Sequence, residues 1–317
     1  MSLVGTFANA VLPILVVAGV GALLGRGTDV DAGPLNTVTI YVFAPALIFH
    51  GLVTTTLSGA TLAKVGVGVV AYITLMAVVA AGVARATGRS EPTLSAVVLL
   101  ATFPNCGNYG VPLSTFAFGE TGRNAAILYL TGETVMAYTV GVYLASRTSG
   151  VGGVTGVKRI LKLPLTYAVV AGALARWTGV VPPAGTTAME TLRLVGDATI
   201  PLMLVVLGIQ LARADYGATI ARVGSPTLLK LFVAPVVAVV LALALGFEEP
   251  GVARTFVLES SMPTAVMPLV LLTEFSEATV DGVPIPQFAS AVILVTTLAS
   301  VPLLTGLIAV LESGVVV

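Results

Sequence analysis

Three acidic side chains interrupt long apolar stretches of the sequence: Glu133, Asp197 and Glu259. An ionisable residue inside a membrane-spanning segment is a functional candidate by default, because an unpaired charge there costs roughly 2.5–3.5 kcal/mol. We expect no lysine or arginine deep in a span to pair with them, since Arg193, one turn from Asp197, stands near a span entrance. Each carboxyl group is therefore expected to be protonated, hydrogen-bonded to free backbone groups or close to a cation.

Glu259 is the strongest candidate of the three. It stands four residues before Pro263, and Ser260, Ser261 and Thr264 follow it closely. A carboxylate, hydroxyl groups and unwound backbone carbonyls together suit Na⁺ or a proton, so Glu259, Ser260 and Ser261 are predicted to form a cation-coupling site. The alternative is a protonated glutamic acid that hydrogen-bonds to a neighbouring helix.

The other two carboxylates receive different interpretations. Glu133 is a second candidate for cation coupling and for a substrate site, although it lies farther from any predicted helix break. Asp197 is interpreted as structural, capping a helix or bonding to the helix expected over 163–181 or over 33–55.

Two apolar stretches each contain a pair of prolines. They read PNCGNYGVP at residues 104–112 and PTAVMP at residues 263–268. Each proline removes one backbone donor and frees the carbonyl one turn earlier, which lipid tolerates only if protein or a water-filled cavity satisfies that group. The helices after each break would present their N-termini, which form a ready anion site. A simple proline kink is the alternative.

The first of these stretches carries the side chains best suited to an anionic ligand. Asn105 and Asn108 can donate amide hydrogen bonds to a carboxylate, or they can satisfy the carbonyls freed by Pro104 and Pro112. We prefer Asn105 for the ligand because it adjoins the break. The predicted substrate site also includes Pro104, Cys106, Tyr109, Pro112, Glu133, Tyr138, Pro263 and Thr264. For the tyrosines and the cysteine, plain packing is the alternative.

The composition shows what must position these residues. Of 317 residues, 56% are hydrophobic and only 9% are charged, where soluble domains carry about 25% charged residues. The mean hydropathy is +1.03. These values exclude a soluble globular enzyme and a disordered chain. The zero net charge argues against nucleic acid as a partner, and one cysteine and one histidine exclude a disulfide framework and a multi-histidine metal site.

The apolar residues form ten segments of the length that crosses a bilayer, so the fold class is an all-α membrane protein. The glycine-rich, basic segment 147–162 separates a first five-helix repeat over 1–146 from a second over 163–317. The ten spans are expected at 4–25, 33–55, 61–86, 92–118, 122–146, 163–181, 189–212, 226–246, 250–274 and 287–311.

The basic residues predict the orientation of these spans. Ten lysines and arginines fall on the side of connections one–two, three–four, five–six, seven–eight and nine–ten, and five fall on the other side. Cytoplasmic loops carry the excess of positive charge. The segment 147–162 is thus predicted to be cytoplasmic, with both termini outside and the chain a multi-pass protein of the cell membrane.

The two halves share signals although they must insert in opposite senses, because five is an odd number. The second span contains Pro45, which follows a hydrophobic residue and an alanine. The seventh span contains Pro201, which follows a threonine and an isoleucine. The fourth and ninth spans carry the proline pairs. Inverted repeats with interrupted helices at matching positions point to a secondary transporter whose site lies near the midplane of the membrane.

These motifs together resemble the auxin efflux carrier (PIN-like) family. Pro104-Asn105 through Gly110-Val111-Pro112-Leu113 is similar to the family's helix-four motif, and Met262-Pro263 through Met267-Pro268-Leu269-Val270, followed by Glu274-Phe275, to its helix-nine partner. Further matches are Phe43-Ala44-Pro45 to Phe49-His50, Asp197 with Leu207-Gly208, and Glu133 to Tyr138. The resemblance runs through nearly the whole chain, and only the large cytoplasmic loop of the long plant members is absent.

The resemblance implies ten helices in two inverted five-helix repeats, with helices four and nine crossing. Helices one, two, six and seven would form a scaffold, often dimeric, so a homodimer is expected. Helices three to five and eight to ten would form a transport domain that moves against the scaffold like an elevator. The implied activity is export of small organic anions such as carboxylates. The carboxylates Glu133 and Glu259 stand where plant auxin carriers have neutral amides, which disfavours auxin itself and favours cation coupling.

Other functions stay open at this point. A sodium/proton antiporter or a sodium-coupled organic anion symporter of a related inverted-repeat fold would use the same carboxylates. An intramembrane enzyme would need a constellation that Ser260 and a distant His50 hardly supply, so no enzyme is expected. A channel fits the repeat less well than alternating access does. No resident cofactor is expected, only Na⁺ or H⁺ as a coupling ion.

Overall fold

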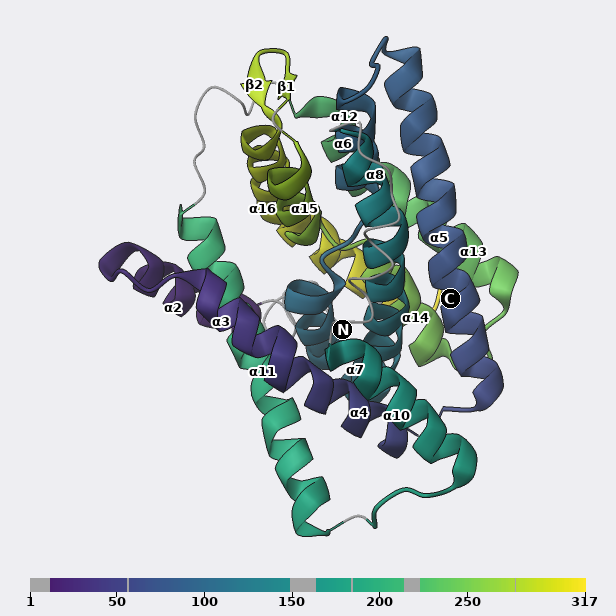
Figure 1. Ribbon diagram of the computed structural model, residues 1–317. Coiled ribbons are helices and arrows are strands. Elements are labelled where there is room, and N and C mark those ends of the chain that lie inside the picture. Colours follow the sequence, from purple (N-terminus) through teal and green to yellow (C-terminus); the bar gives the residue numbers. More distant parts are fainter. Residues whose placement is uncertain (1–11, 56, 149–163, 184, 214–222, 277) are drawn as a thin grey trace.

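The computed structural model describes residues 12–55, 57–148, 164–183, 185–213, 223–276 and 278–317. Helices make up most of these residues, with several π-helical turns, labelled η, inside longer runs (Figure 1). The first half contains α2 (Leu12–Gly27), α3 (Ala32–Val38), η2 (Thr39–Phe43), α4 (Ala44–Thr54), α5 (Gly59–Ala86), α6 (Thr93–Thr102), η3 (Cys106–Gly110), α7 (Val111–Met136), η4 (Ala137–Gly141) and α8 (Val142–Arg147).

The second half contains α10 (Pro164–Thr178), α11 (Thr187–Arg213), α12 (Gly224–Leu228), η6 (Leu229–Val233), α13 (Ala234–Leu245), α14 (Pro250–Ser260), α15 (Met267–Phe275), β1 (Thr279–Val280), β2 (Val283–Pro284) and α16 (Ile285–Glu312). Within the described part of the chain, six continuous helical stretches are long and apolar enough to cross a membrane: Ala32–Thr54, Gly59–Ala86, Cys106–Arg147, Thr187–Ile209, Gly224–Leu245 and Ile285–Glu312. The shorter helices fall within the other expected spans.

Prolines stand at the start of several of these helices, three of which follow a π-helical turn. Pro45, Pro112 and Pro235 stand in the first turn of α4, α7 and α13, where a missing N–H is tolerated. A π-helical turn directly precedes each of these helices, so the helical run continues through the proline with one wider turn. The run over Cys106–Arg147 bends at Gly119 (φ 61°, ψ −144°), between the expected fourth and fifth spans.

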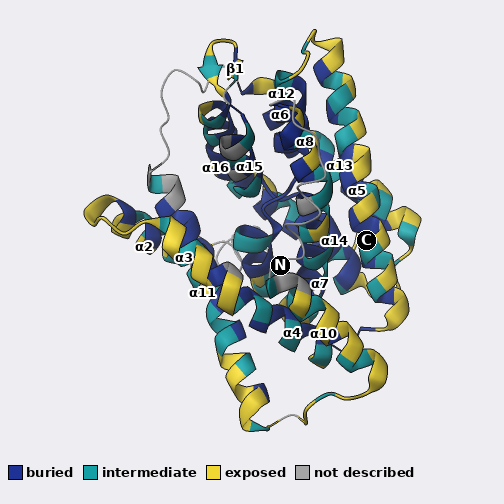
Figure 2. Cartoon of the chain, in the orientation of Figure 1, coloured by how far each residue is buried: buried dark blue, intermediate teal, exposed yellow. Residues whose placement is uncertain are grey.

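The helices pack in two groups. Helices α2, α4, α10 and α11 contact one another, whereas α5, α6, α7, α13, α14 and α16 pack together around the buried core (Figures 1 and 2). In the first group α2 and α11 pack so closely that a Cβ at Gly208 would lie 1.9 Å from the carbonyl oxygen of Ala18. The groups meet where α11 contacts η3 and α7, and where α4 contacts α7.

Ion pairs at one end of the molecule join connections that the sequence places on the same side. Arg89 binds Asp281 at 2.6 Å, and Arg147 binds Glu91 at 3.2 Å. The hydrogen bond to Asp281 raises the pKa of Arg89. Connections three–four, five–six and nine–ten therefore lie at one end, as an even number of crossings between them requires.

The opposite end carries the even-numbered connections. Lys64 binds Glu248 at 3.6 Å, and Arg176 donates to the carbonyl of Thr55 at 2.6 Å. These contacts join connections two–three, six–seven and eight–nine. Which end faces the cytoplasm stays a prediction from the basic residues, and the segment 147–162 lies almost wholly outside the described residues.

A short β-hairpin between α15 and α16 was not expected from the sequence. Its strands pair antiparallel, with Val280 opposite Val283. Asp281 (φ 50°) and Gly282 (φ 81°) form the turn, and Asp-Gly is a favoured pair for a tight hairpin turn whose central residues need positive φ. The hairpin is a small addition to described residues that are otherwise mostly helical, which is consistent with the expected all-α membrane protein.

Candidate functional site

The two proline-containing spans are interrupted at positions that lie side by side. Helix α6 ends at Thr102 and α14 ends at Ser260. Between the interruptions the backbones pair antiparallel, with Pro104 opposite Thr264. The N–H of Asn105 donates to the carbonyl of Pro263 at 2.7 Å, and the N–H of Ala265 donates to that of Phe103 at 3.0 Å. The two unwound segments therefore satisfy each other's backbone groups inside the protein.

Thr264 also satisfies the carbonyl that Pro104 leaves without its helical donor. Its hydroxyl donates to Leu100 O, four residues before Pro104, at 2.9 Å. Its own N–H donates to the hydroxyl of Thr296 on α16 at 3.2 Å. The expected alternative role of Asn105, satisfying the carbonyl freed by Pro104, is thus taken by Thr264.

The interruptions are shorter than the proline pairs suggested. Pro104 and Pro263 lie within the unwound segments, but Pro112 and Pro268 each occupy the first turn of the following helix, α7 or α15. A helical turn, η3, already begins at Cys106, and the N–H of Gly110 donates to the carbonyl of Asn105 at 2.9 Å. The unwound segment of the fourth span is therefore residues 103–105.

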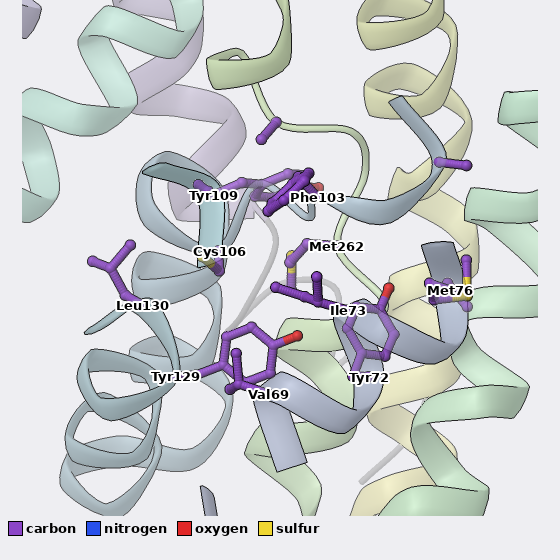
Figure 3. Close-up of a cluster of buried hydrophobic side chains, with 14 of the residues drawn as sticks. Val69, Tyr72, Ile73, Met76, Phe103, Cys106, Tyr109, Tyr129, Leu130 and Met262 are labelled. Carbon is purple, nitrogen blue, oxygen red and sulfur yellow. The ribbon is translucent and has the colours of Figure 1, made fainter. Parts of the chain in front are cut away.

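The amide of Asn105 stands at the start of this helical turn. The residue is 4% exposed, and its Nδ2 has no hydrogen-bond partner among the described residues. A buried amide donor without a partner loses the hydration it would have in water, which makes it a strong site for an acceptor. Asn108 is half-buried on η3, and Cys106 and Tyr109 are buried beside Phe103, Tyr129 and Met262 (Figure 3).

Glu259 lies against the same helical turn. Its side chain is fully buried, Oε1 accepts a hydrogen bond from Ser114 at 2.6 Å, and Oε2 has no partner among the described residues. A Cβ at Gly110 would lie 2.0 Å from Oε2, so only glycine leaves room for the carboxyl group there. Ser114, which sequence reasoning missed, stands one turn after Gly110 on the same face.

The hydroxyls expected to surround Glu259 point elsewhere. The hydroxyl of Ser260 pairs with that of Tyr129 at 3.0 Å, and the hydroxyl of Ser261 donates to Val257 O at 2.6 Å. The hydroxyl of Thr264 donates to Leu100 O. The structure therefore does not gather Glu259, Ser260 and Ser261 into one set of side-chain oxygens. In the described part of the chain, no group of three histidine, cysteine or acidic residues is arranged to hold a metal ion.

Glu133 lies closer to the break than its place in the sequence suggested. It is buried in α7 and interacts electrostatically with Cys106, the first residue of η3, and with Glu259. The fold thus brings both carboxylates to one cluster under the crossing segments. The side chain of Tyr138 lies outside the described residues.

The expectation that no basic residue lies deep in a span is wrong. Lys230, assigned from the sequence to a connection, is fully buried in η6 between α12 and α13. Its Nζ donates to the Tyr72 hydroxyl at 3.0 Å and to Thr102 O at 3.4 Å. The available signal was its position five residues inside the expected span 226–246.

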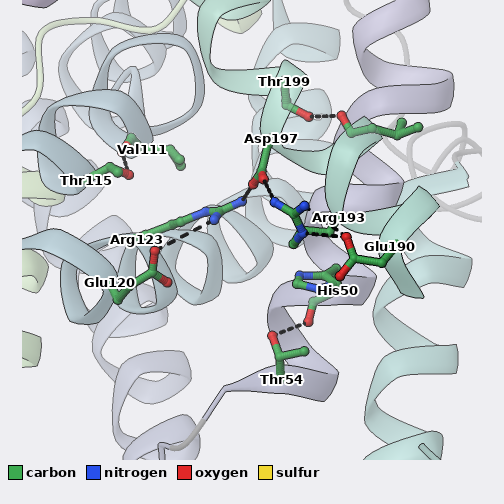
Figure 4. Close-up of polar contacts among 11 residues, drawn as sticks. His50, Thr54, Val111, Thr115, Glu120, Arg123, Glu190, Arg193, Asp197 and Thr199 are labelled. Carbon is green, nitrogen blue, oxygen red and sulfur yellow. Dashed lines mark hydrogen bonds and ion pairs between the residues drawn. The ribbon is translucent and has the colours of Figure 1, made fainter. Parts of the chain in front are cut away.

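Asp197 is also paired, and not with the helices expected. It forms an ion pair with Arg123 of α7 and a second, at 3.2 Å, with Arg193 of its own helix (Figure 4). His50 lies beside Arg193 and Glu190. Ser260 pairs with Tyr129 instead, so His50 and Ser260 have different partners. Asp197 therefore joins α11 to α7, across the boundary between the two groups of helices.

Comparison with known proteins shows the family to which this chain belongs. A family model described as "Membrane transport protein", that of the auxin efflux carriers, matches residues 6–152 and 147–308. The chain belongs to the auxin efflux carrier family. As a member of this family, it is a multi-pass membrane protein, and its crossing broken helices lie within the matched residues.

Several prokaryotic members of the carrier family match along almost the full length. A protein of Methanothermobacter thermautotrophicus described as "Uncharacterized transporter" is 32% identical over 299 residues, which are 93% of this chain and 96% of the relative. A Rhizobium meliloti protein described as "Putative malonate transporter" is 30% identical over 319 residues, 96% of this chain and 95% of the relative. A further uncharacterized transporter of Methanocaldococcus jannaschii is 25% identical over 305 residues.

Proposed function

We propose that this carrier-family protein is a secondary active transporter of small organic anions, which bind at the crossing of the two broken spans. The observation that carries the proposal is the buried Asn105 amide without a partner. It lies at the start of η3, where helix N–H groups favour negative charge. An oxygen of a substrate carboxylate would accept a hydrogen bond from Asn105 Nδ2, which has no partner among the described residues.

Malonate is the first substrate to test. The Rhizobium meliloti relative bears the name of a malonate transporter, and a short dicarboxylate is compatible with a site built from amide and backbone donors. No free arginine or lysine is needed at the crossing, because charge-assisted hydrogen bonds from neutral donors already stabilise a carboxylate. The protein acts as a carrier rather than an enzyme.

The transport cycle we propose is alternating access. The halves 1–146 and 163–317 form inverted five-helix repeats, with interrupted helices at matching positions. The group α2, α4, α10 and α11 is the scaffold, and the group that holds the crossing is the transport domain, which moves like an elevator and exports its substrate. Dimerisation through the scaffold, as the family resemblance implies, completes this account.

Cation coupling is assigned to the buried carboxylates. Glu259 and Glu133 lie next to the proposed substrate site, and a proton or Na⁺ bound there would offset the negative charge of the anion. Sodium/proton antiport is the second candidate function, since two neighbouring buried carboxylates could exchange cations without any organic substrate.

A binding screen distinguishes the two candidates. The purified protein would be heated in detergent with malonate and a panel of other organic acids, each with NaCl or choline chloride at several pH values. A ligand at 100 times its dissociation constant stabilises by about 2.7 kcal/mol. Stabilisation by a carboxylate supports the organic anion carrier, whereas a response to Na⁺ and pH with none to any carboxylate supports the antiporter.

A further inference from the structure

Lys230 lies at the point where both broken helices end. Its Nζ donates to the carbonyl of Thr102, the last residue of α6, at 3.4 Å. Its other partner, the Tyr72 hydroxyl, donates in turn to the carbonyl of Ser260, the last residue of α14, at 2.6 Å. The C-terminus of a helix carries partial negative charge. Two such ends therefore converge on one ammonium group.

The surroundings of Lys230 add further negative potential. Glu133 and Cys106 are the titratable groups that interact with it electrostatically, and Glu133 also interacts with Glu259. Among the described residues, the buried side chains of ionisable acidic or basic type are Glu133, Lys230 and Glu259. Neither carboxylate lies within ion-pair distance of Lys230 among the described residues, so the ammonium sits among oxygens rather than against one partner.

Carbonyl oxygens at helix C-terminal ends are ligands that a small cation such as Na⁺ binds in a membrane protein, and here the Tyr72 phenol oxygen adds to them. A lysine ammonium is a compact point charge on a flexible stem. It can therefore occupy such a position permanently, whereas Na⁺ would have to be bound and released in each cycle.

We propose that the Lys230 ammonium is a tethered cation that occupies a sodium-type site at the ends of α6 and α14, so that this carrier works without Na⁺. The proposal rests on the proposed function in one respect only, that the two broken helices form the working centre. It assigns the coupling role of the carboxylates to protons, since the cation position beside them is already filled. A lysine that merely caps a helix would leave no cation selectivity when it is removed.

The test is thermal unfolding of the purified full chain in NaCl and in choline chloride of equal ionic strength. We expect the wild type to unfold at the same temperature in both salts. Lys230→Ser empties the position while keeping its oxygen ligands, and should become selectively stabilised by Na⁺, by at least ~2 °C. Lys230→Arg keeps the charge and should stay insensitive to Na⁺. Lys64→Ser, at a half-buried lysine of α5 that binds Glu248, is the matched control and should show no selectivity.

Two results would overturn the proposal: selective stabilisation of the wild type by Na⁺, or a folded Lys230→Ser variant that does not distinguish the two salts. If Lys230→Ser fails to fold, Lys230→Ala is measured in its place, and selective stabilisation of the wild type by Na⁺ would still overturn the proposal by itself. The measurement needs no substrate. Failure of every carboxylate to bind would therefore contradict the proposed function while leaving this sodium test intact.

Discussion

The hydroxyl of Thr264 donates to the carbonyl of Leu100 across the crossing of the two broken spans, at 2.9 Å. Pro104 cannot supply the N–H that this carbonyl would accept in a continuous helix. One side chain of the ninth span therefore repairs the fourth span. Because this repair uses Thr264, the amide of Asn105 is left without a partner among the described residues and is available to a ligand.

Replacing Thr264 with valine should destabilise the protein. The change keeps the shape of the side chain but leaves the buried Leu100 carbonyl unsatisfied, which costs about 1–3 kcal/mol. Thr264→Ser keeps the hydroxyl and should retain most of the stability. Thr305→Val is the control, because its hydroxyl donates to Val301 O within its own helix, α16. Thermal unfolding in detergent measures all three, and equal midpoints for the Thr264→Val and Thr305→Val variants would contradict the bridging role.

Gly110 and Gly107 stand on the same helical turn and should respond differently to alanine. A Cβ at Gly110 would meet Glu259 Oε2 at 2.0 Å, whereas a Cβ at Gly107 meets nothing closer than Leu130 Cδ1 at 3.5 Å. Gly110→Ala should therefore displace the carboxyl group and reduce transport at least tenfold, while Gly107→Ala stays active. Uptake of labelled malonate into proteoliposomes measures the difference. Similar rates for the two variants would place Glu259 outside the working site.

Glu259→Gln should abolish the dependence of transport on pH. The amide can no longer take up and release a proton, but it keeps the size of the carboxyl group and an acceptor for Ser114. Glu248→Gln, at an exposed carboxylate paired with Lys64, is the control and should behave as the wild type. The measurement is the initial rate of uptake against pH, with and without Na⁺. A coupling role for Glu259 is excluded if its glutamine variant keeps the wild-type dependence.

The ion pair between Arg123 and Asp197 should couple the two groups of helices energetically. A double-mutant cycle with Arg123→Met and Asp197→Asn is expected to give a coupling of up to ~1 kcal/mol in stability, since Asp197 is partly exposed. The same cycle on the rate of transport tests whether the pair holds one state of the carrier. Strict additivity in both measurements would show that the pair contributes neither to stability nor to the cycle.

The sequence predicted the parts of this protein that depend on local chemistry. Apolar length predicted helices, and the spacing of prolines predicted where two of them are interrupted. It also placed Asn105 at the first interruption, because an amide beside a helix N-terminus suits an anion. The hairpin was missed although Asp281-Gly282 carries its signal, because strands of two residues are too short to show an alternating pattern.

The partners of the buried polar groups could not be predicted in the same way. Thr264 and Leu100 are 164 residues apart, and Ser114 reaches Glu259 over 145 residues. Such pairs depend on which faces of two helices meet, and apolar periodicity does not determine this within a membrane, where every face is hydrophobic. Lys230 was misplaced for that reason, because a lysine near the end of a span can turn either to the interface or to the interior.

The most direct test of the central claim is the affinity of the protein for malonate, or for the carboxylate that the screen selects, before and after Asn105→Ala. Isothermal titration calorimetry on the purified protein measures it, with Asn36→Ala on α3 as the matched control. Loss of a hydrogen bond to a charged group should weaken binding by roughly 10–100-fold while the thermal unfolding midpoint without ligand stays near that of the wild type. An Asn105→Ala variant that binds the carboxylate with wild-type affinity would contradict the account.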